Sequence, residues 1–203
     1  MLIKDQYIFA LGDNKEEAIH VKQGEVIEFV TKDCFNNQIS SEDYVLDALD
    51  WDHINPATGP VYVEGAQTGD VLKVEILDIE LAEMGTMCCL PENGVLGNDI
   101  TESKIKKVPV QNGIAKFNEF ELPLNPMIGV IGVAPEGEPV PCGTPGRHGG
   151  NMDNTKIAKG SELFFHLCLI IRNLIVRKDI NIESGNASRL LQTVFHKTSA
   201  IHA

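Results

Sequence analysis

Residues 146–154, which read GRHGGNMDN, gather side chains that can do chemistry on a flexible stretch of backbone. His148 supplies an imidazole and Asp153 a carboxylate, and the glycines between them allow the backbone to bend so that the two side chains converge. Such a pair could bind a metal ion that lowers the pKa of its water, or could carry protons itself. The spacing is also compatible with a loop clasp in which the two side chains only bond to each other.

Two further carboxylates stand at the ends of predicted strands. Asp33 follows the apolar run at 26–31, and Glu64 ends a strand beside Gly65, within the run at 60–66. Strand ends commonly carry sites, and Asp33 with amide side chains such as Asn37 could hold a cation or the NH₂ group of a substrate. Glu64 could face a pocket as acid, base or ligand. Turn chemistry explains Asp33 and Asn37 as well, because Asp and Asn bond their own backbone in tight turns, and Glu64 could equally be a solvated hairpin residue.

Cys142 is the best thiol candidate for a covalent mechanism. His148 is six residues away, but no activating partner for the thiol can be identified. The chain has no G-x-S-x-G elbow, which argues against a serine nucleophile. Its cysteines are odd in number and include no C-x-x-C pair, so we expect reduced thiols packed as small apolar groups.

The elements that position these residues are predicted to be mainly strands. Apolar, β-rich runs bounded by Gly, Pro, Asn or Asp occupy 26–31, 60–66, 71–81 and 126–135. The third run alternates apolar and charged residues, the period-2 pattern of a half-buried strand. Asn112-Gly113 lies between apolar stretches and predicts a hairpin. Strands at this spacing predict a mainly β fold with little helix, an antiparallel sandwich or barrel.

Other local patterns predict a short helix over 40–51, a rigid turn at 55–60, and a boundary near residue 165. All ten prolines and most glycines precede residue 166, whereas basic residues outnumber acidic ones after it. We therefore expect a β domain over 1–165 and a divergent tail over 166–203, with a short α/β element in the tail.

Charge narrows the class of partner. The net charge is −12, which argues against nucleic acid or an anionic membrane and favours a small neutral molecule. Lys4 and Asp5 interrupt the N-terminal apolar stretch, so no secretory signal is expected. The run at 167–176 is split by Arg172 and is too short to span a bilayer. A cytoplasmic location follows as an expectation.

Four blocks in sequence order, at 31–39, 55–76, 126–138 and 142–154, resemble the acetamidase/formamidase family. The resemblance covers roughly residues 1–165. It implies hydrolysis of a short linear amide to a carboxylate and ammonia on a β fold of jelly-roll character. Family members continue after the GSELFF equivalent into a Gly-Asp-x-His and Gly-Asp-Gly-Glu segment, whereas here a different sequence begins at His166. We expect a truncation or a reading-frame change at that point.

The leading hypothesis is a cytoplasmic amidohydrolase that uses a metal-activated water, with zinc or calcium as the ion. Exposed strand edges favour a homo-oligomer. The alternative is an inactive β-sandwich remnant that binds a small ligand or self-associates. The site residues are assigned as His148, Asp153 and Glu64 for catalysis, Asn37 and Asn151 for substrate binding, and Asp33, His148 and Asp153 for the metal.

Overall fold

The computed structural model describes residues 1–12, 19–167, 173–176, 179–181 and 187–197, with side chains described up to residue 167. Short strands dominate it, as predicted. The helical elements among the described residues are single 3₁₀ turns: η2 (Leu46–Ala48), η3 (Trp51–His53) and η4 (Gly97–Asp99). No helix in these described ranges is long and apolar enough to cross a membrane.

The strands form two larger sheets, one four-stranded sheet and two small pairs. The five-stranded sheet has the order β1 (Leu2–Ile3), β5 (Val26–Phe29), β19 (Ala187–Lys197), β7 (Val71–Leu81), β16 (Glu162–His166). The six-stranded sheet has the order β15 (Gly149–Asn151), β13 (Val130–Val133), β17 (Asn173–Val176), β6 (Ala57–Val63), β2 (Tyr7–Ile8), and β4 (Ile19–Val21) also pairs with β6. The small pairs are β12 (Asn125–Met127) with β18 (Asp179–Asn181), and β14 (Val140–Pro141) with β3 (Ala10–Leu11).

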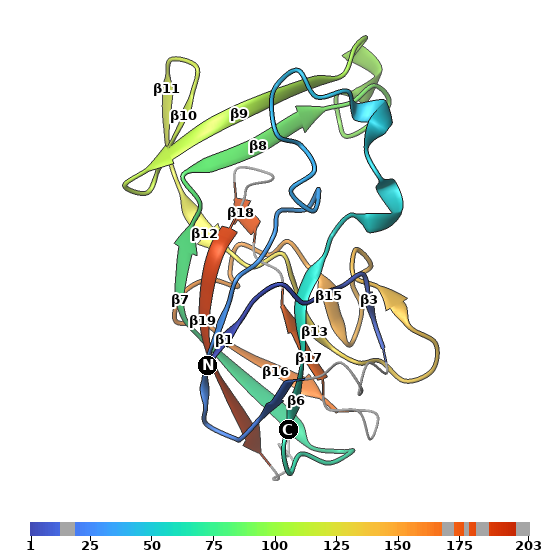
Figure 1. The fold of residues 1–203 in the computed structure, drawn as a ribbon, viewed down its shortest axis with the longest axis vertical. Helices are drawn as coiled ribbons and strands as arrows, with labels where there is room; N and C mark the ends of the chain where they lie inside the picture. Colours follow the sequence, from blue (N-terminus) through green and yellow to red (C-terminus); the bar gives the residue numbers. More distant parts are fainter. Residues whose placement is uncertain (13–18, 168–172, 177–178, 182–186, 198–203) are drawn as a thin grey trace.

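The four-stranded sheet stands apart from the other two. Its order is β11 (Phe120–Pro123), β10 (Ile114–Phe117), β9 (Lys104–Gln111), β8 (Met84–Cys89). Figure 1 shows it at one end of the long axis, with the two larger sheets toward the other end. The segment between β5 and β6 packs against it through a small apolar cluster that includes Ile39, Leu46 and Leu49. This segment therefore joins the four-stranded sheet to the rest of the fold.

The main core lies between elements of both larger sheets, and the period-2 pattern explains how β7 contributes to it. Leu72, Val74 and Ile76 are fully buried in one cluster, whereas Lys73 and Glu75 between them remain partly exposed. The same cluster contains side chains of β5, β6 and β13. The half-buried strand predicted at 71–81 is confirmed.

The hairpin predicted at Asn112-Gly113 is also confirmed. Gln111 at the end of β9 pairs with Ile114 at the start of β10, so two residues form the turn. Asn112 has φ 54° and Gly113 has φ 73°, the left-handed backbone that favours Asn and Gly.

The helix predicted over 40–51 is wrong. The chain forms the separate turns η2 and η3 there, and Asp50 lies between them. The Gln38 side chain accepts from the Asp50 N–H at 2.9 Å and donates to the Asp50 carbonyl at 3.1 Å. Because those are the backbone groups that a continuous helix would use, this contact ends the helical path.

The rigid turn predicted at 55–60 is also wrong for most of its length. Asn55 has φ 52°, but β6 already begins at Ala57. Ala57 and Thr58 pair with β2, and the Thr58 hydroxyl donates to the Val30 carbonyl at 3.0 Å. Burial and pairing of these residues outweigh the turn preference of a Pro-Gly-rich sequence, so the segment is a buried strand.

Strands from the end of the chain pair with strands that precede residue 165. β19 lies between β5 and β7, and β17 lies between β13 and β6. Beyond residue 166 the described segments contain strands and no helix, so the helical part of the predicted α/β element is not found there. Cys168 and much of the run at 167–176 lie outside the described residues. The division at residue 165 stays a prediction: a separate tail requires a protease-resistant fragment ending near Phe165, whereas docked strands require protection through β19.

Candidate active site

The first candidate element is the loop that follows β5. The Asn37 N–H donates to Asp33 Oδ1 at 2.6 Å, and the Asp33 N–H donates to Asn37 Oδ1 at 3.1 Å. Asn36 and Asn37 both have φ 58°, which Asn tolerates better than most residues. Asp33 is only 2% exposed, so its carboxylate is held in place by this reciprocal clasp. The predicted turn chemistry is present, and it orients both side chains.

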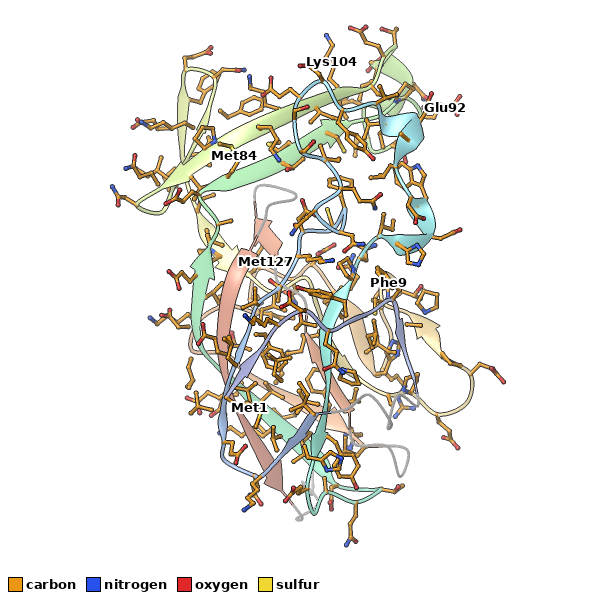
Figure 2. All side chains as sticks on the ribbon, viewed as in Figure 1. Met1, Phe9, Met84, Glu92, Lys104 and Met127 are labelled. Atoms are coloured by element: carbon orange, nitrogen blue, oxygen red, sulfur yellow. The ribbon has the colours of Figure 1, made fainter. Side chains whose placement is uncertain are left out.

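A pocket of about 740 Å³ opens beside this loop, between it and the junction of β7 with β8. We name it the Asp33 pocket. Figure 2 labels Met84, which marks the beginning of β8 and lines the pocket. Its wall residues include Asp33, Asn37, Glu80, Glu83, Met84 and Lys107. Sequence reasoning missed Lys107 and Met84, because only the tertiary fold brings β8 and β9 beside the Asp33 loop.

The second candidate element is the turn that carries His148. The Gly146 N–H donates to the Gly149 carbonyl at 2.7 Å, and the Gly149 N–H donates to the Gly146 carbonyl at 3.0 Å, so Arg147 and His148 are the central residues of a tight turn. A Cβ on Gly146 would lie 2.8 Å from the His148 ring. Glycine at 146 is therefore what allows the imidazole to fold back over its own turn.

Glycines also allow this turn to pack closely against β13, because they have no Cβ atom. A Cβ on Gly132 would lie 2.5 Å from the His148 carbonyl oxygen, and one on Gly149 would lie 2.2 Å from the Ile131 carbonyl oxygen. A Cβ on Gly150 would lie 2.2 Å from the Thr144 carbonyl oxygen. Each of these contacts is shorter than a methyl group allows, so the glycines serve close packing as well as bending.

The His148 imidazole is half-buried, and its Nε2 atom is fully buried with no hydrogen-bond partner among the described residues. Burial lowers the pKa of His148 below its ordinary value, and a hydrogen bond with the Thr144 backbone opposes that shift. The neutral ring is therefore favoured, because burial penalises the charged form. A neutral imidazole can accept a proton or bind a metal.

Asp153 and Asn151 lie just beyond the turn. Asn151 is the last residue of β15 and pairs with Val130, and its side-chain amide donates to Asp153 Oδ2 at 2.9 Å. Asp153 is exposed and has φ 41°. The local chain thus brings His148, Asn151 and Asp153 to one edge of the six-stranded sheet, where Asp153 bonds Asn151.

Asn55 contacts the Asp33 loop and the segment that precedes the His148 turn. Its N–H donates to the Cys34 carbonyl in the Asp33 loop at 2.7 Å. Its side-chain amide nitrogen lies so close to Gly143 that a Cβ there would be 2.9 Å away. Asn55, two residues before β6, therefore connects the Asp33 loop with the segment that leads to the His148 turn.

Glu64 lies elsewhere. It is exposed, and it follows the last residue of β6, whereas Asn55 precedes the first. The register β13–β17–β6 places Val133, which bonds the His148 carbonyl, level with Val61. Glu64 is three residues further along and three strand spacings away from β15, about 10 Å along the sheet and about 14 Å across it. The structure does not bring Glu64 together with His148.

The candidate site residues provide only part of a metal-binding site. In the part of the chain that the structure describes, no three His, Cys, Asp or Glu side chains are grouped so that they could hold an ion. His148 Nε2 is a suitable donor, because it is buried and unpaired within that part. Asp33 and Asp153 are bonded to Asn37 and Asn151 respectively. The described residues supply one fitting donor and not a complete set.

Cys142 is packed in the interior, as expected for a small apolar group. It is 0% exposed, clusters with Ile8, Leu11 and Val130, and directs its thiol to the Ile8 carbonyl at 3.7 Å. A thiol buried among apolar side chains is a poor nucleophile, because burial disfavours the thiolate. Cys34, Cys88 and Cys89 are half-buried and form no disulfide among the described residues.

Comparisons with known proteins agree with this arrangement. The family model for the acetamidase/formamidase family matches residues 13–140. The structure of an acetamidase from Bacillus halodurans is 34% identical with a TM-score of 0.93, and the match covers 98% of this chain and 72% of that one. A predicted acetamidase/formamidase from Thermoanaerobacter tengcongensis is 41% identical with a TM-score of 0.91, over 98% of this chain and 70% of that one.

A more distant structure shares the fold. An acetamidase from Yersinia enterocolitica is 22% identical with a TM-score of 0.81, over 94% of this chain and 65% of that one. Among curated proteins the comparison gives no match. Four sequence blocks, the family model and two solved structures above 30% identity agree, and the chain belongs to the acetamidase/formamidase family.

Proposed function

We propose that this protein hydrolyses short linear amides such as formamide and acetamide to the carboxylate and ammonia. Membership of the family and the likeness to acetamidases carry the proposal. The net charge of −12 supports a small neutral substrate rather than nucleic acid or an anionic membrane. A cytoplasmic location is part of the same proposal.

His148 is the residue to which we assign the central proton transfer. Amide hydrolysis needs a water nucleophile and a proton for the amine leaving group. Burial lowers the pKa of His148 and so favours the neutral imidazole, to which we assign the proton of the attacking water. The proton then passes to the amine as the C–N bond breaks. Asp153, oriented by Asn151, is the acidic partner nearest in sequence, and Asn37 and Asn151 are proposed to bind the substrate.

We keep a divalent ion, zinc or calcium, as a separate proposal with Asp33, His148 and Asp153 as the ligands to test. When bound, such an ion would polarise the carbonyl and acidify water. The proton transfer by His148 does not depend on this ion, because the described residues do not form a complete set of ligands. Glu64 as a catalytic carboxylate also stays a proposal, and its distance along β6 argues for a role outside the proton transfer.

The direct test is ammonia release from formamide and acetamide by purified protein, with and without added zinc or calcium. We expect release by the wild type and at least a hundredfold loss in His148→Ala. Release that equals the His148→Ala level would contradict the hydrolase and favour the inactive binding protein. Chelator treatment followed by measurement of bound metal decides the ion. Release that survives chelation but disappears in Cys142→Ala would favour the thiol mechanism.

Self-association is the remaining proposal about partners. β11 is an edge strand of the four-stranded sheet, and Phe120 at its beginning is 57% exposed. Unpaired edges favour strand pairing between copies. Sedimentation velocity tests this: a monomer at all concentrations would contradict it, and a Phe120→Lys variant should shift the equilibrium toward monomer.

A further inference from the structure

Lys107 lines the Asp33 pocket, and its hydrogen bonds to the protein occupy only some of the N–H donors of its ammonium group. Its Nζ donates to the Thr86 hydroxyl at 2.7 Å and to the Ile39 carbonyl at 3.0 Å. Its backbone N–H donates to Glu42 Oε1 at 2.8 Å. An ammonium group has three N–H donors, so one remains uncommitted among the contacts of the described residues. Since Lys107 lines the pocket, that donor is available to an occupant.

The two acceptors of Lys107 fix where its ammonium group stands. Thr86 is 1% exposed on β8, and Ile39 is buried in the segment that follows the Asp33 loop. Because both partners are buried and belong to different elements, the ammonium group cannot swing freely into solvent. A donor held in this way binds a carbonyl oxygen with little loss of conformational entropy.

Asn37 supplies a second oriented donor. Its side-chain oxygen accepts from the Asp33 N–H, so the NH₂ end of the amide points away from that contact. Asn37 is exposed and lines the same pocket. The NH₂ group of Asn37 and one N–H of the Lys107 ammonium group are therefore both available to a ligand in the Asp33 pocket.

The acidic residues that line the pocket determine which ligand charge is favoured there. Asp33, Glu80 and Glu83 line it, and Lys107 is the one cationic residue among the described lining residues. Carboxylates accept hydrogen bonds from an amide NH₂ group. They repel a carboxylate ligand, because like charges at short range are unfavourable in a partly desolvated site. The pocket therefore matches a neutral primary amide better than the acid formed from it.

We propose that the Asp33 pocket binds the amide group of the substrate, with Lys107 Nζ donating to the carbonyl oxygen and the acidic wall accepting from the amide nitrogen. This inference rests on the proposed amide hydrolysis and adds the pocket and Lys107 to it. Asn55 contacts the Cys34 carbonyl in the Asp33 loop and Gly143, five residues before His148, whereas His148 itself is not among the described residues that line the pocket. In the reaction, Lys107 stabilises the negative charge that develops on the carbonyl oxygen.

Binding is measured first, independently of turnover. Acetamide is titrated into ¹⁵N-labelled protein, and the side-chain signals of Asn37 and Lys107 are followed. We expect saturable shifts of both signals, at least tenfold weaker binding of acetate, and weaker binding of N,N-dimethylacetamide, which has no N–H to donate. Shifts confined to other residues, or acetate binding as tightly as acetamide, would overturn the proposal.

Lys107→Met is then compared with Lys106→Met. Lys106 is the adjacent residue of β9, and its Nζ lies 3.6 Å from Glu42 Oε1, but it does not line the pocket. Both variants lose one positive charge. We expect a roughly 100- to 1,000-fold lower kcat/KM for acetamide in Lys107→Met, the cost of losing one oxyanion donor, and an unchanged value in Lys106→Met. Equal kcat/KM in Lys107→Met and wild type would reduce Lys107 to a structural contact and overturn the proposal.

The two readouts separate this inference from the proposed function. Acetamide that binds in the pocket without ammonia release contradicts the hydrolysis and supports the pocket. Ammonia release without shifts at Asn37 and Lys107 supports the hydrolysis and contradicts the pocket. If Lys107→Met does not fold, the wild-type titration with acetamide and acetate still decides.

Discussion

The His148 turn and the Asp33 loop hold their functional side chains in opposite ways. At the turn, the absence of glycine side chains lets one backbone segment pack directly against another. At the loop, side chains bond backbone in a clasp, and a pocket of about 740 Å³ opens beside it. Close packing positions a reactive group, whereas a clasped loop leaves room for a ligand. Both the glycine-rich turn and the clasped loop could be predicted from local sequence, whereas the pocket beside the loop could not.

Substitution of a glycine in the His148 turn should cause the largest loss in the free energy of unfolding. Gly149→Ala places a methyl group 2.2 Å from a backbone oxygen at φ 99°, so clash and strain act together. We expect a loss of at least about 3 kcal/mol in the free energy of unfolding. Gly137→Ala is the matched control, because Gly137 has φ 92° and open space around it, and it should cost about 1–2 kcal/mol. Equal losses in urea unfolding would show that close packing is not the reason for Gly149.

The Asp33 clasp should give the next largest effect. Asp33→Ala leaves the Asn37 N–H without its acceptor next to a buried position, and we expect a loss of about 2 kcal/mol. Asp33→Asn retains an oxygen that can accept this hydrogen bond and should lose less. The measurement is urea unfolding of the two variants beside the wild type. A larger loss in Asp33→Asn than in Asp33→Ala would mean that the clasp does not stabilise the loop.

His148 should make stability depend on pH in a defined direction. Burial lowers the pKa of His148 in the folded state, so the unfolded chain binds more protons as pH falls through about 6.5. Stability from this residue is therefore retained above that pH and lost below it. We expect the Tm of the wild type to fall relative to that of His148→Asn between pH 7.5 and pH 5. An NMR titration of His148 with a midpoint above the ordinary value would contradict the sign.

Substitution of Cys142 should have the smallest effect on ammonia release. Cys142→Ala removes a buried sulfur and should cost about 1 kcal/mol in unfolding free energy. Ammonia release should equal that of the wild type, because the thiol points to a backbone carbonyl in the interior. A loss of release in a variant that remains folded would transfer the nucleophile from water to Cys142.

Local sequence signals predicted elements well where one interaction dominates. The alternation in β7 and the Asn112-Gly113 hairpin were predictable, because burial on one face and positive φ each depend on a few adjacent residues. The helix over 40–51 and the turn at 55–60 failed for one reason. Gln38 bonds the Asp50 backbone, and β2 pairs with Ala57 and Thr58, so partners distant in sequence outweighed local preference.

The residues of the candidate site also separate into those that local sequence could predict and those that it could not. His148, Asn151 and Asp153 could be grouped from sequence, since they lie within six residues of one another along the chain. Asp33 and Asn37 could be paired for the same reason. Lys107 and Glu83 carried no signal, because a lysine or glutamate in a charged strand usually faces solvent. Glu64 looked equivalent to Asp33 as a strand-end carboxylate, but strand direction placed it at the other end of β6.

The sequence by itself determined the family, the β character and the glycine-rich turn, because each depends on residue types at short spacing. The tertiary structure alone decided that β8 and β9 lie beside the Asp33 loop, that Asn55 connects this loop to the segment before His148, and that Glu64 stands apart. Contacts between residues far apart in the chain depend on how sheets pack and register. That information is spread over the whole core and resides in no single motif.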